Sequence, residues 1–225
     1  MTEHAGPPAE PAAIVPLPTG ADAEACFAPI AGEPPIVRAV RALLGRVAAP
    51  RVAVVVAEPL LARVRDVLGA AGLSEVAVLA GAGRTESIRA GLEYLVRKPL
   101  SSVLLHDCRH PLAPGEVTDR VVAGLGAGHG IVVPVAAVTD SMKSVDERGV
   151  VVTTVDRATL LAVQYPRGFA VATLGELIAR DAADELDVAL ATGLQVTTVD
   201  GHADAVRFSL PDDTALLEAI IASRR

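Results

Sequence analysis

Short apolar runs rich in valine, leucine and isoleucine alternate with amphipathic segments along most of this sequence, and no other feature constrains the fold as much. Runs of strand length lie at residues 13–15, 51–57, 76–80, 102–105, 131–135 and 195–199. Segments with apolar residues at helical spacing lie at residues 36–46, 59–71, 86–97, 116–125, 173–181 and from 212 onward. Strands that alternate with helices favour a parallel sheet covered on both faces. We therefore predict a three-layer α/β fold with a mostly parallel sheet.

The composition suits such a core. Hydrophobic residues make up 51% of the 225 residues but aromatic residues only 2%, so the core must be aliphatic, as in strands buried on both faces. The formal net charge is −7 and no aromatic-basic patch is present, which argues against nucleic acid as a partner. We see no internal repeat, and we expect a single domain over residues 12–225 after a disordered lead-in at residues 1–11.

No part of the sequence is predicted to enter a membrane. The N-terminus has neither a basic start nor an apolar core, so it does not resemble a signal peptide. The uncharged run at 121–139 is long enough to cross a bilayer, but four glycines and a proline interrupt it, which indicates a helix end, a turn and a buried strand. Cys26 and Cys108 form no CxxC motif and no zinc spacing. We expect them to be reduced, buried residues of a cytoplasmic protein.

The strand-helix pattern is interrupted at residues 136–158. Two β-like stretches there flank Asp146-Glu147-Arg148-Gly149, which is typical turn chemistry. We predict a β-hairpin arm inserted into the α/β domain. Its apolar residues at 150–152 would be exposed in a single chain, which favours contact with a partner subunit.

The generic nucleotide-binding motifs are missing from the sequence. It contains no Walker loop, and its glycine-rich stretch at 124–130 lacks the GxGxxG spacing. Residues 81–92 (GAGRTESIRAGL) instead combine a tight glycine turn with a helix start, and the N-terminus of a helix attracts anions. An ordinary well-capped helix is the alternative interpretation.

Two further polar stretches are candidates for a site. Residues 105–111 (LHDCRHP) follow an apolar strand, at the carboxyl edge of the sheet where α/β folds bind ligands. Asp107 in this stretch could coordinate Mg²⁺ or hold a hydroxyl group, although a polar turn is an equal alternative. The arm carries TDSMK at 139–143 and TVDR at 154–157, whose basic residues could clamp a phosphate. A solvated hairpin is the alternative there.

Taken together, in this order and spacing, these stretches resemble the 2-C-methyl-D-erythritol 4-phosphate cytidylyltransferase family of the non-mevalonate isoprenoid pathway. The resemblance runs from about residue 12 to the C-terminus and includes AVQYPRGF at 162–169 and VDGHADAVRFSLPDD at 199–213. It implies a Rossmann-like nucleotidyltransferase fold and a homodimer joined through the β-arms. It also implies that the polyol phosphate attacks the α-phosphorus of CTP and releases pyrophosphate, with Mg²⁺ required and no protein nucleophile. Catalysis would then be positioning and neutralisation of charge.

The family motifs assign roles to particular residues. The resemblance implies catalytic roles for Asp107, Arg157 and Arg207, with Asp107 also as the metal ligand. The implied nucleotide-binding residues are Gly20, Gly81, Arg84, Ser87, Asp107 and Cys108. The implied acceptor-binding residues are Asp140, Ser141, Arg157, His110 and Tyr165, and Lys143 also matches the arm pattern.

The sequence departs from the family where positive charge is expected. The loop after the first strand reads PLPTGADAEA at 16–25, without the usual glycines and basic residues and with Asp22 and Glu24 added. His110 stands at the position of a usual arginine, and residues 165–167 read YPR instead of TPQ. Each lost preorganised charge typically costs about 10²–10³-fold in rate. We therefore expect impaired activity, with a non-catalytic dimeric scaffold or ligand sensor as the alternative and a transferase for another nucleotide or donor as a third.

Overall fold

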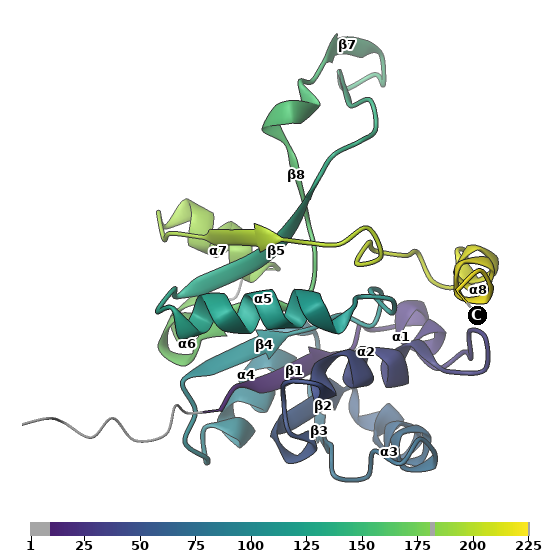
Figure 1. Ribbon diagram of the computed structural model, residues 1–225, viewed down its shortest axis with the longest axis vertical. Helices are drawn as coiled ribbons and strands as arrows, with labels where there is room; N and C mark the ends of the chain where they lie inside the picture. Colours follow the sequence, from purple (N-terminus) through teal and green to yellow (C-terminus); the bar gives the residue numbers. More distant parts are fainter. Residues whose placement is uncertain (1–9, 181–182, 225) are drawn as a thin grey trace, which may run out of the picture.

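The computed structural model describes residues 10–180 and 183–224, and within them the chain forms a mixed sheet with helices on both faces and a separate two-stranded sheet in an arm (Figure 1). The sheet has the strand order β10-β5-β9-β4-β1-β2-β3, and β8 pairs with β5. Its strands are β1 (Ala12–Pro16), β2 (Val52–Val56), β3 (Ala77–Ala80), β4 (Ser102–Leu105), β5 (Ile131–Ala137), β8 (Leu161–Val163), β9 (Arg167–Ala170) and β10 (Thr197–Asp200). The four adjacent strands β4, β1, β2 and β3 pair in parallel, as do β5 and β10. Strand β9 runs antiparallel to both β4 and β5. The predicted mostly parallel sheet is confirmed.

The helices bury the two faces of the sheet in separate cores. One core joins α2 (Pro35–Leu44), α3 (Leu61–Ala70) and α5 (Gly115–Gly126) to the sheet, and the other joins α4 (Arg84–Leu95), α6 (Val171–Ile178) and α7 (Glu185–Ala191). The central strand β1 contributes Ala13 and Val15 to the first core and Ala12 and Ile14 to the second. Because successive side chains of a strand point to opposite faces, such a strand must be apolar throughout. This explains the continuous apolar runs in the sequence.

A close approach between α4 and β1 depends on Gly91. A Cβ atom at this position would lie 2.9 Å from Cγ2 of Ile14, closer than carbon atoms pack in proteins. Gly91 therefore lets α4 lie against the centre of the sheet. This helix also carries Arg84 at its first turn, so its position determines where that side chain reaches.

The uncharged run at 121–139 folds as predicted, into the end of α5, a turn and the strand β5. Gly128 supplies the turn with its φ of 92°, a conformation that favours glycine. In the described part of the chain, no helix is long and apolar enough to cross a membrane. Residues 1–9 of the predicted lead-in lie outside the described residues, and Glu10 and Pro11 directly precede β1.

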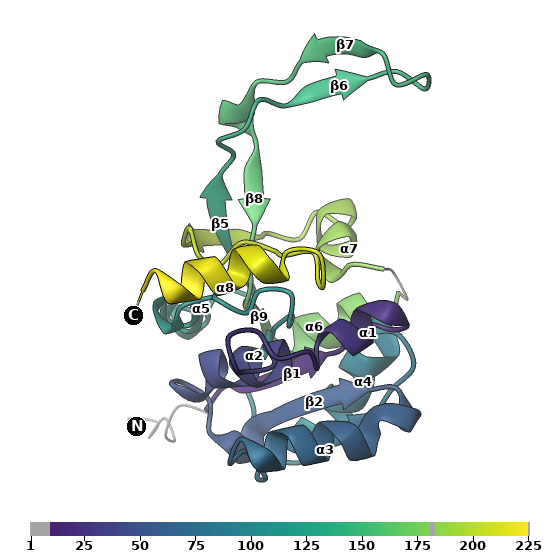
Figure 2. The same cartoon turned by 90° about the vertical axis from the view of Figure 1, so that its right-hand side faces the viewer.

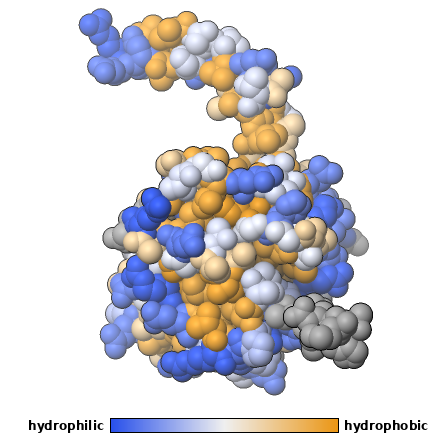
Figure 3. All heavy atoms as spheres, turned by 90° about the vertical axis from the view of Figure 1, so that its left-hand side faces the viewer, coloured by the Kyte–Doolittle hydropathy of each residue, from blue (hydrophilic) through white to orange (hydrophobic). Residues whose placement is uncertain are grey.

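The predicted hairpin arm is present and projects from the body of the domain (Figure 2). Strands β5 and β8 pair at its base, and β6 (Lys143–Val145) and β7 (Val151–Thr154) pair at its tip. Residues 136–137 of β5 pair with β8 at the base of the arm. Four tip valines are 57–64% exposed, at positions 145, 150, 151 and 152. Apolar side chains also gather where the arm leaves the body (Figure 3), among them Leu161 and Val163.

Four helices and strands were not predicted from the sequence: α1 (Ala21–Ala25), α7, β8 and β9. The strand β9 contains Arg167 and Gly168 and lacks the apolar alternation of a typical strand. Both residues are nevertheless buried, because Gly168 lies under Val121 and Leu125 of α5 and Arg167 pairs with acidic residues at the start of α7. The last helix, α8 (Thr214–Ala222), packs separately through Leu217, against Ile30 and Phe208; these three residues lie in a small third core.

Candidate active site

The loops that follow β1 and β4 meet at the carboxyl edge of the sheet. Ile14 of β1 pairs with Leu105 of β4 in parallel register, so the two loops leave the sheet side by side. They enclose a cavity of about 210 Å³ together with the N-terminus of α4. Its lining consists of Pro16, Leu17, Pro18, Thr19, Asp22, Gly83, Arg84, Asp107 and Arg109. Ligands bind α/β sheets at this edge, so the cavity is the candidate site.

Asp107 is held by the side chain of Arg109 two residues later. The guanidinium donates from Nε to both carboxylate oxygens at 3.0 and 3.1 Å and from Nη2 to Oδ2 at 2.5 Å, and the Arg109 amide donates to Oδ1 at 2.9 Å. Burial of the Asp107 carboxyl, which is 3% exposed as a residue, opposes its ionisation. The hydrogen bonds and the charge of Arg109 outweigh burial and lower the pKa of Asp107 to about 2. The residue is therefore a carboxylate at neutral pH.

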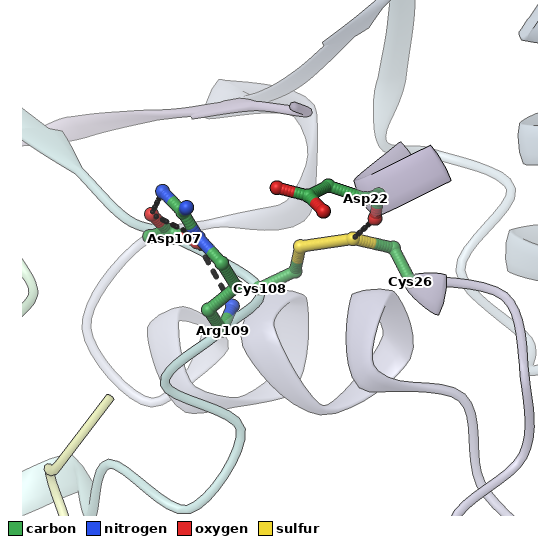
Figure 4. Close-up of a disulfide and its surroundings, with 5 residues drawn as sticks. All are labelled: Asp22, Cys26, Asp107, Cys108 and Arg109. Atoms are coloured by element: carbon green, nitrogen blue, oxygen red, sulfur yellow. Dashed lines mark hydrogen bonds and ion pairs between the residues drawn. A yellow bond between two sulfur atoms is a disulfide. The ribbon is translucent and has the colours of Figure 1, made fainter. Parts of the chain in front are cut away.

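Cys26 and Cys108 form a disulfide, with their Cα atoms 6.3 Å apart (Figure 4). The prediction that they are reduced is therefore wrong, although both are fully buried as predicted. The reason is topological: Cys26 directly follows α1 in the β1 loop, Cys108 lies in the β4 loop, and the parallel pairing of β1 with β4 brings these loops together. The disulfide ties the helix that carries Asp22 to the loop that carries Asp107 and Arg109. A nucleotide-binding role was predicted for Cys108, but this residue does not line the cavity.

Arg84 is positioned by a partly buried polar network. It donates to both carboxylate oxygens of Glu185 at 3.1 and 2.7 Å and to the hydroxyl of Tyr165 at 3.1 Å. Arg167 reaches the same Glu185 carboxylate at 3.1 Å, pairs with Asp184 at 2.8 Å and lies 4.5 Å from the centre of the Tyr165 ring. Burial raises the pKa of Tyr165 to about 12, against the opposing effect of the two arginines. Tyr165 is therefore neutral and holds Arg84. It was predicted to bind the acceptor, and it does not line this cavity.

Sequence reasoning missed Asp184 and Glu185. Asp184 caps α7 by accepting a hydrogen bond from the Leu186 amide at 2.8 Å, and Glu185 follows at the first turn. A capping aspartate before an apolar run is a helix-start signal in the sequence. Nothing local could have linked Glu185, the next residue, to Arg84, which lies 101 residues away in the chain.

The two histidines beside Asp107 carry no charge at neutral pH. Burial lowers the pKa of His106 to about 3, and burial also lowers the pKa of His110. His110 Nδ1 lies 3.0 Å from the carbonyl oxygen of Ala205, and its ring is 4.9 Å from that of Tyr165. His110 was predicted to bind the acceptor, but the structure places it in this buried contact and not on the cavity surface. It therefore does not supply the positive charge of the arginine it replaces.

Arg207 faces a second cavity of about 180 Å³ that adjoins the first. Asp22 and Arg109 line both cavities, and Arg207, Ser209, Leu210 and Asp212 complete the second.

Three predicted nucleotide-binding residues lie near the cavities or in the core. Gly20 adopts a φ of 65° just before α1. Gly81 and Ser87 pack together, since a Cβ on Gly81 would lie 2.7 Å from the Ser87 hydroxyl oxygen. Ser87 is 1% exposed, and neither of these two residues lines either cavity.

The predicted arm residues lie outside both cavities. Asp140, Ser141, Lys143 and Arg157 are all exposed, and none lines either cavity. Arg157 donates to the carbonyl oxygen of Thr139, and Lys143 Nζ donates to the Thr154 hydroxyl at 2.7 Å. Within one chain, the arm therefore does not complete the candidate site.

A bound Mg²⁺ would find few protein ligands here. Among the described residues, no group of three or more histidine, cysteine or acidic side chains could hold a metal ion. Asp107 and Asp22 are the carboxylates that line the first cavity. Sites that bind Mg²⁺ together with a substrate phosphate need only one or two carboxylates, so this donor set fits a metal that arrives with a nucleotide.

The fold and the cavity suit a protein that binds a phosphorylated ligand. A buried carboxylate and two arginines line a cavity at the carboxyl edge of the sheet, where α/β folds bind ligands, and guanidinium groups match phosphate oxygens. Comparison with known proteins places this domain among the nucleotidyltransferases. The family model described as "IspD: 2-C-methyl-D-erythritol 4-phosphate cytidylyltransferase" matches residues 11–223. The chain belongs to this family, as the sequence resemblance indicated.

Individual relatives agree with the family assignment. The chain is 34% identical to the 2-C-methyl-D-erythritol 4-phosphate cytidylyltransferase of Streptomyces coelicolor, over 97% of this chain and 87% of that protein. It is 37% identical to the protein of the same name from Saccharopolyspora erythraea, over 90% and 93%. The crystal structure of the Thermus thermophilus protein of that name superposes with a TM-score of 0.72 at 27% identity, covering 93% of this chain and 98% of that one. A synthase structure from Anaerococcus prevotii, at 17% identity and a TM-score of 0.79, shares the fold and covers 95% of this chain and 96% of that one.

Proposed function

We propose that this protein transfers a cytidylyl group from CTP to 2-C-methyl-D-erythritol 4-phosphate. The observation that carries the proposal is that Asp107, Arg84 and Arg109 share one cavity in a chain of this family. A phosphate oxygen of the acceptor attacks the α-phosphorus of CTP, the bond from that phosphorus to the β-phosphate oxygen breaks, and pyrophosphate leaves. The products are the CDP-polyol and pyrophosphate, and no protein atom forms a covalent bond.

The residues of the chain act by positioning and by charge. Arg84, Arg109 and Arg207 supply guanidinium groups along the two adjoining cavities, and guanidinium groups match phosphate oxygens in pairs. Neutralising the charge that develops on the leaving pyrophosphate lowers the barrier. Mg²⁺, held by Asp107 and by the phosphates, would contribute further neutralisation. Glu185 keeps Arg84 in place at the start of α4.

A second copy of the chain would complete the acceptor side of the site. The exposed valines at the tip of the arm support a homodimer joined through this hairpin. Arg157, Asp140 and Ser141 would then reach the acceptor phosphate in the cavity of the other subunit. Their distance from the cavities of their own chain supports this arrangement.

The test is pyrophosphate release by the purified protein with CTP, 2-C-methyl-D-erythritol 4-phosphate and Mg²⁺. We expect turnover, and a loss of about 10²–10³-fold in Asp107→Asn, which keeps the shape of the side chain but removes its charge. Arg46→Gln is the matched control, since Arg46 is an exposed arginine paired with Asp119 outside the cavities. Equal rates in wild type and Asp107→Asn would contradict the proposal.

The acidic β1 loop favours a second candidate, a non-catalytic relative that binds a phosphorylated ligand. Asp22 lines both cavities, and residues 16–25 contain no lysine or arginine. Absence of turnover in a folded protein that still binds CTP would support this candidate, or a transferase for another donor, over the cytidylyltransferase.

A further inference from the structure

Two arginines line the first cavity, and a buried carboxylate holds each of them. Arg84 is held by Glu185 and by the Tyr165 hydroxyl, and Arg109 is held by its neighbour Asp107. Their side chains are about equally exposed, 25% for Arg84 and 26% for Arg109. Of these two arginines, only Arg109 also lines the second cavity. It therefore stands between the two cavities, where an elongated anion would pass from one to the other.

Two carboxylates face this one guanidinium. Asp107 binds it directly, and Asp22 lies on the other side of the opening, with its carboxylate directed toward the same space (Figure 4). The hydrogen bonds and charge of Asp107 raise the pKa of Arg109, and the charge of Asp22 adds to this effect. The disulfide next to Asp107 fixes the relative position of the two loops that carry these groups.

We propose that Arg109 contributes most to triphosphate binding among the arginines of the two cavities and that it supplies, from the β4 loop, the positive charge that the β1 loop lacks. The inference rests on the proposed function and deepens it. Phosphate oxygens would compete with the Asp107 oxygens for the same Nε and Nη2 donors. When Arg109 turns to a phosphate, the Asp107 carboxylate becomes free for other ligands. Asp22 opposes the incoming anion and so sets the affinity.

The test measures anion binding without turnover, by titration calorimetry with inorganic tripolyphosphate and with CTP. We expect Arg109→Gln to weaken binding of tripolyphosphate by about 10–100-fold, the value of a charged hydrogen bond. Arg109→Lys should restore part of this loss, because it keeps the charge but not the two-pronged geometry. Arg46→Gln, the exposed control outside both cavities, should bind as wild type does.

Asp22→Asn provides a second test that does not disturb the buried Asp107 pair. Asp22 is an exposed residue, so the variant is expected to fold. We expect it to bind tripolyphosphate several-fold more tightly than wild type, and to lose most of this gain when combined with Arg109→Gln. Unchanged binding in Asp22→Asn, or wild-type binding in Arg109→Gln, would overturn the inference.

The two proposals fail in different ways. A wild-type protein that releases no pyrophosphate but binds tripolyphosphate through Arg109 would sink the proposed reaction and leave this inference standing. An Arg109→Gln variant with normal turnover and an unchanged KM for CTP would overturn this inference and leave the proposed reaction standing. In an active enzyme, we expect Arg109→Gln to raise the KM for CTP more than the KM for the acceptor.

Discussion

Opening the Cys26–Cys108 disulfide should strongly destabilise the folded protein. The two cysteines are 82 residues apart in the chain, and a cross-link of this length restricts the unfolded chain much more than the folded one. The loop-closure relation gives about 4.5 kcal/mol of stabilisation at 25 °C for such a separation. In a chain of this size each kcal/mol shifts the melting temperature by about 2–4 °C. Reduction should therefore lower the melting temperature by about 9–18 °C.

The assay compares thermal unfolding with and without dithiothreitol, monitored by circular dichroism. We expect dithiothreitol to lower the melting temperature of the wild type and to leave a Cys26→Ala, Cys108→Ala double variant unchanged. Titration of thiols in urea gives an independent readout, with no free thiol in the protein as purified under air and two after reduction. The double variant is a necessary control because it separates the cross-link from other effects of the reductant.

Two results would refute this reasoning. One is a wild-type protein that titrates two free thiols in urea without any reductant. The other is a melting temperature that dithiothreitol does not change although the thiols become free. The first would return the cysteines to the reduced state that the sequence suggested, and the second would show that the closed loop contributes nothing to stability.

Three further predictions concern packing, pH and assembly. Gly91→Ala should cost about 1–3 kcal/mol by overpacking α4 against β1, whereas Gly126→Ala, where a Cβ meets nothing within 4 Å, should not; urea unfolding measures both. His106 should make stability depend on pH, because its pKa is about 3 when folded against 6.5 when unfolded. Between those pH values only the unfolded chain binds this proton. The stability that neutral, buried His106 contributes to the folded protein is therefore complete above about pH 6.5 and falls as the pH drops toward about 3. The urea midpoint at several pH values measures this fall in stability. Val151→Asp at the tip of the arm should shift sedimentation from dimer to monomer, and Val96→Asp, also on an exposed valine, should not.

Specific outcomes would contradict these predictions. Equal unfolding midpoints for the two glycine variants would mean that α4 can move away from the sheet at no cost. A His106→Asn variant with the same fall in stability between neutral and acidic pH as wild type would assign the dependence to other groups. A Val151→Asp protein that sediments as the wild type does would exclude the tip of the arm as the dimer contact.

Much of the fold could be predicted from local patterns. Each strand from β1 to β5 is an apolar run, and each of the helices α2 to α5 has apolar residues at helical spacing, so the three-layer architecture follows from periodicity alone. The strand β9 could not be found in this way. Its Arg167 is buried only because Asp184 and Glu185, 17 and 18 residues later, neutralise it, and a buried charge without such partners would be too costly.

The candidate site also has a part that the sequence predicted and a part that it did not. That Asp107 and Arg84 would lie at the carboxyl edge of the sheet followed from the sequence, because each comes shortly after an apolar strand and parallel strands end at a common edge. Only the tertiary structure decided the contacts of these side chains. They are the ion pair of Asp107 with Arg109, the burial of His110, the disulfide between Cys26 and Cys108, and the ion pair of Glu185 with Arg84. Periodicity is a local property that a single segment carries by itself. The partner that a charged or reactive side chain finds depends on which distant segments the sheet order brings together, and only the complete fold determines that.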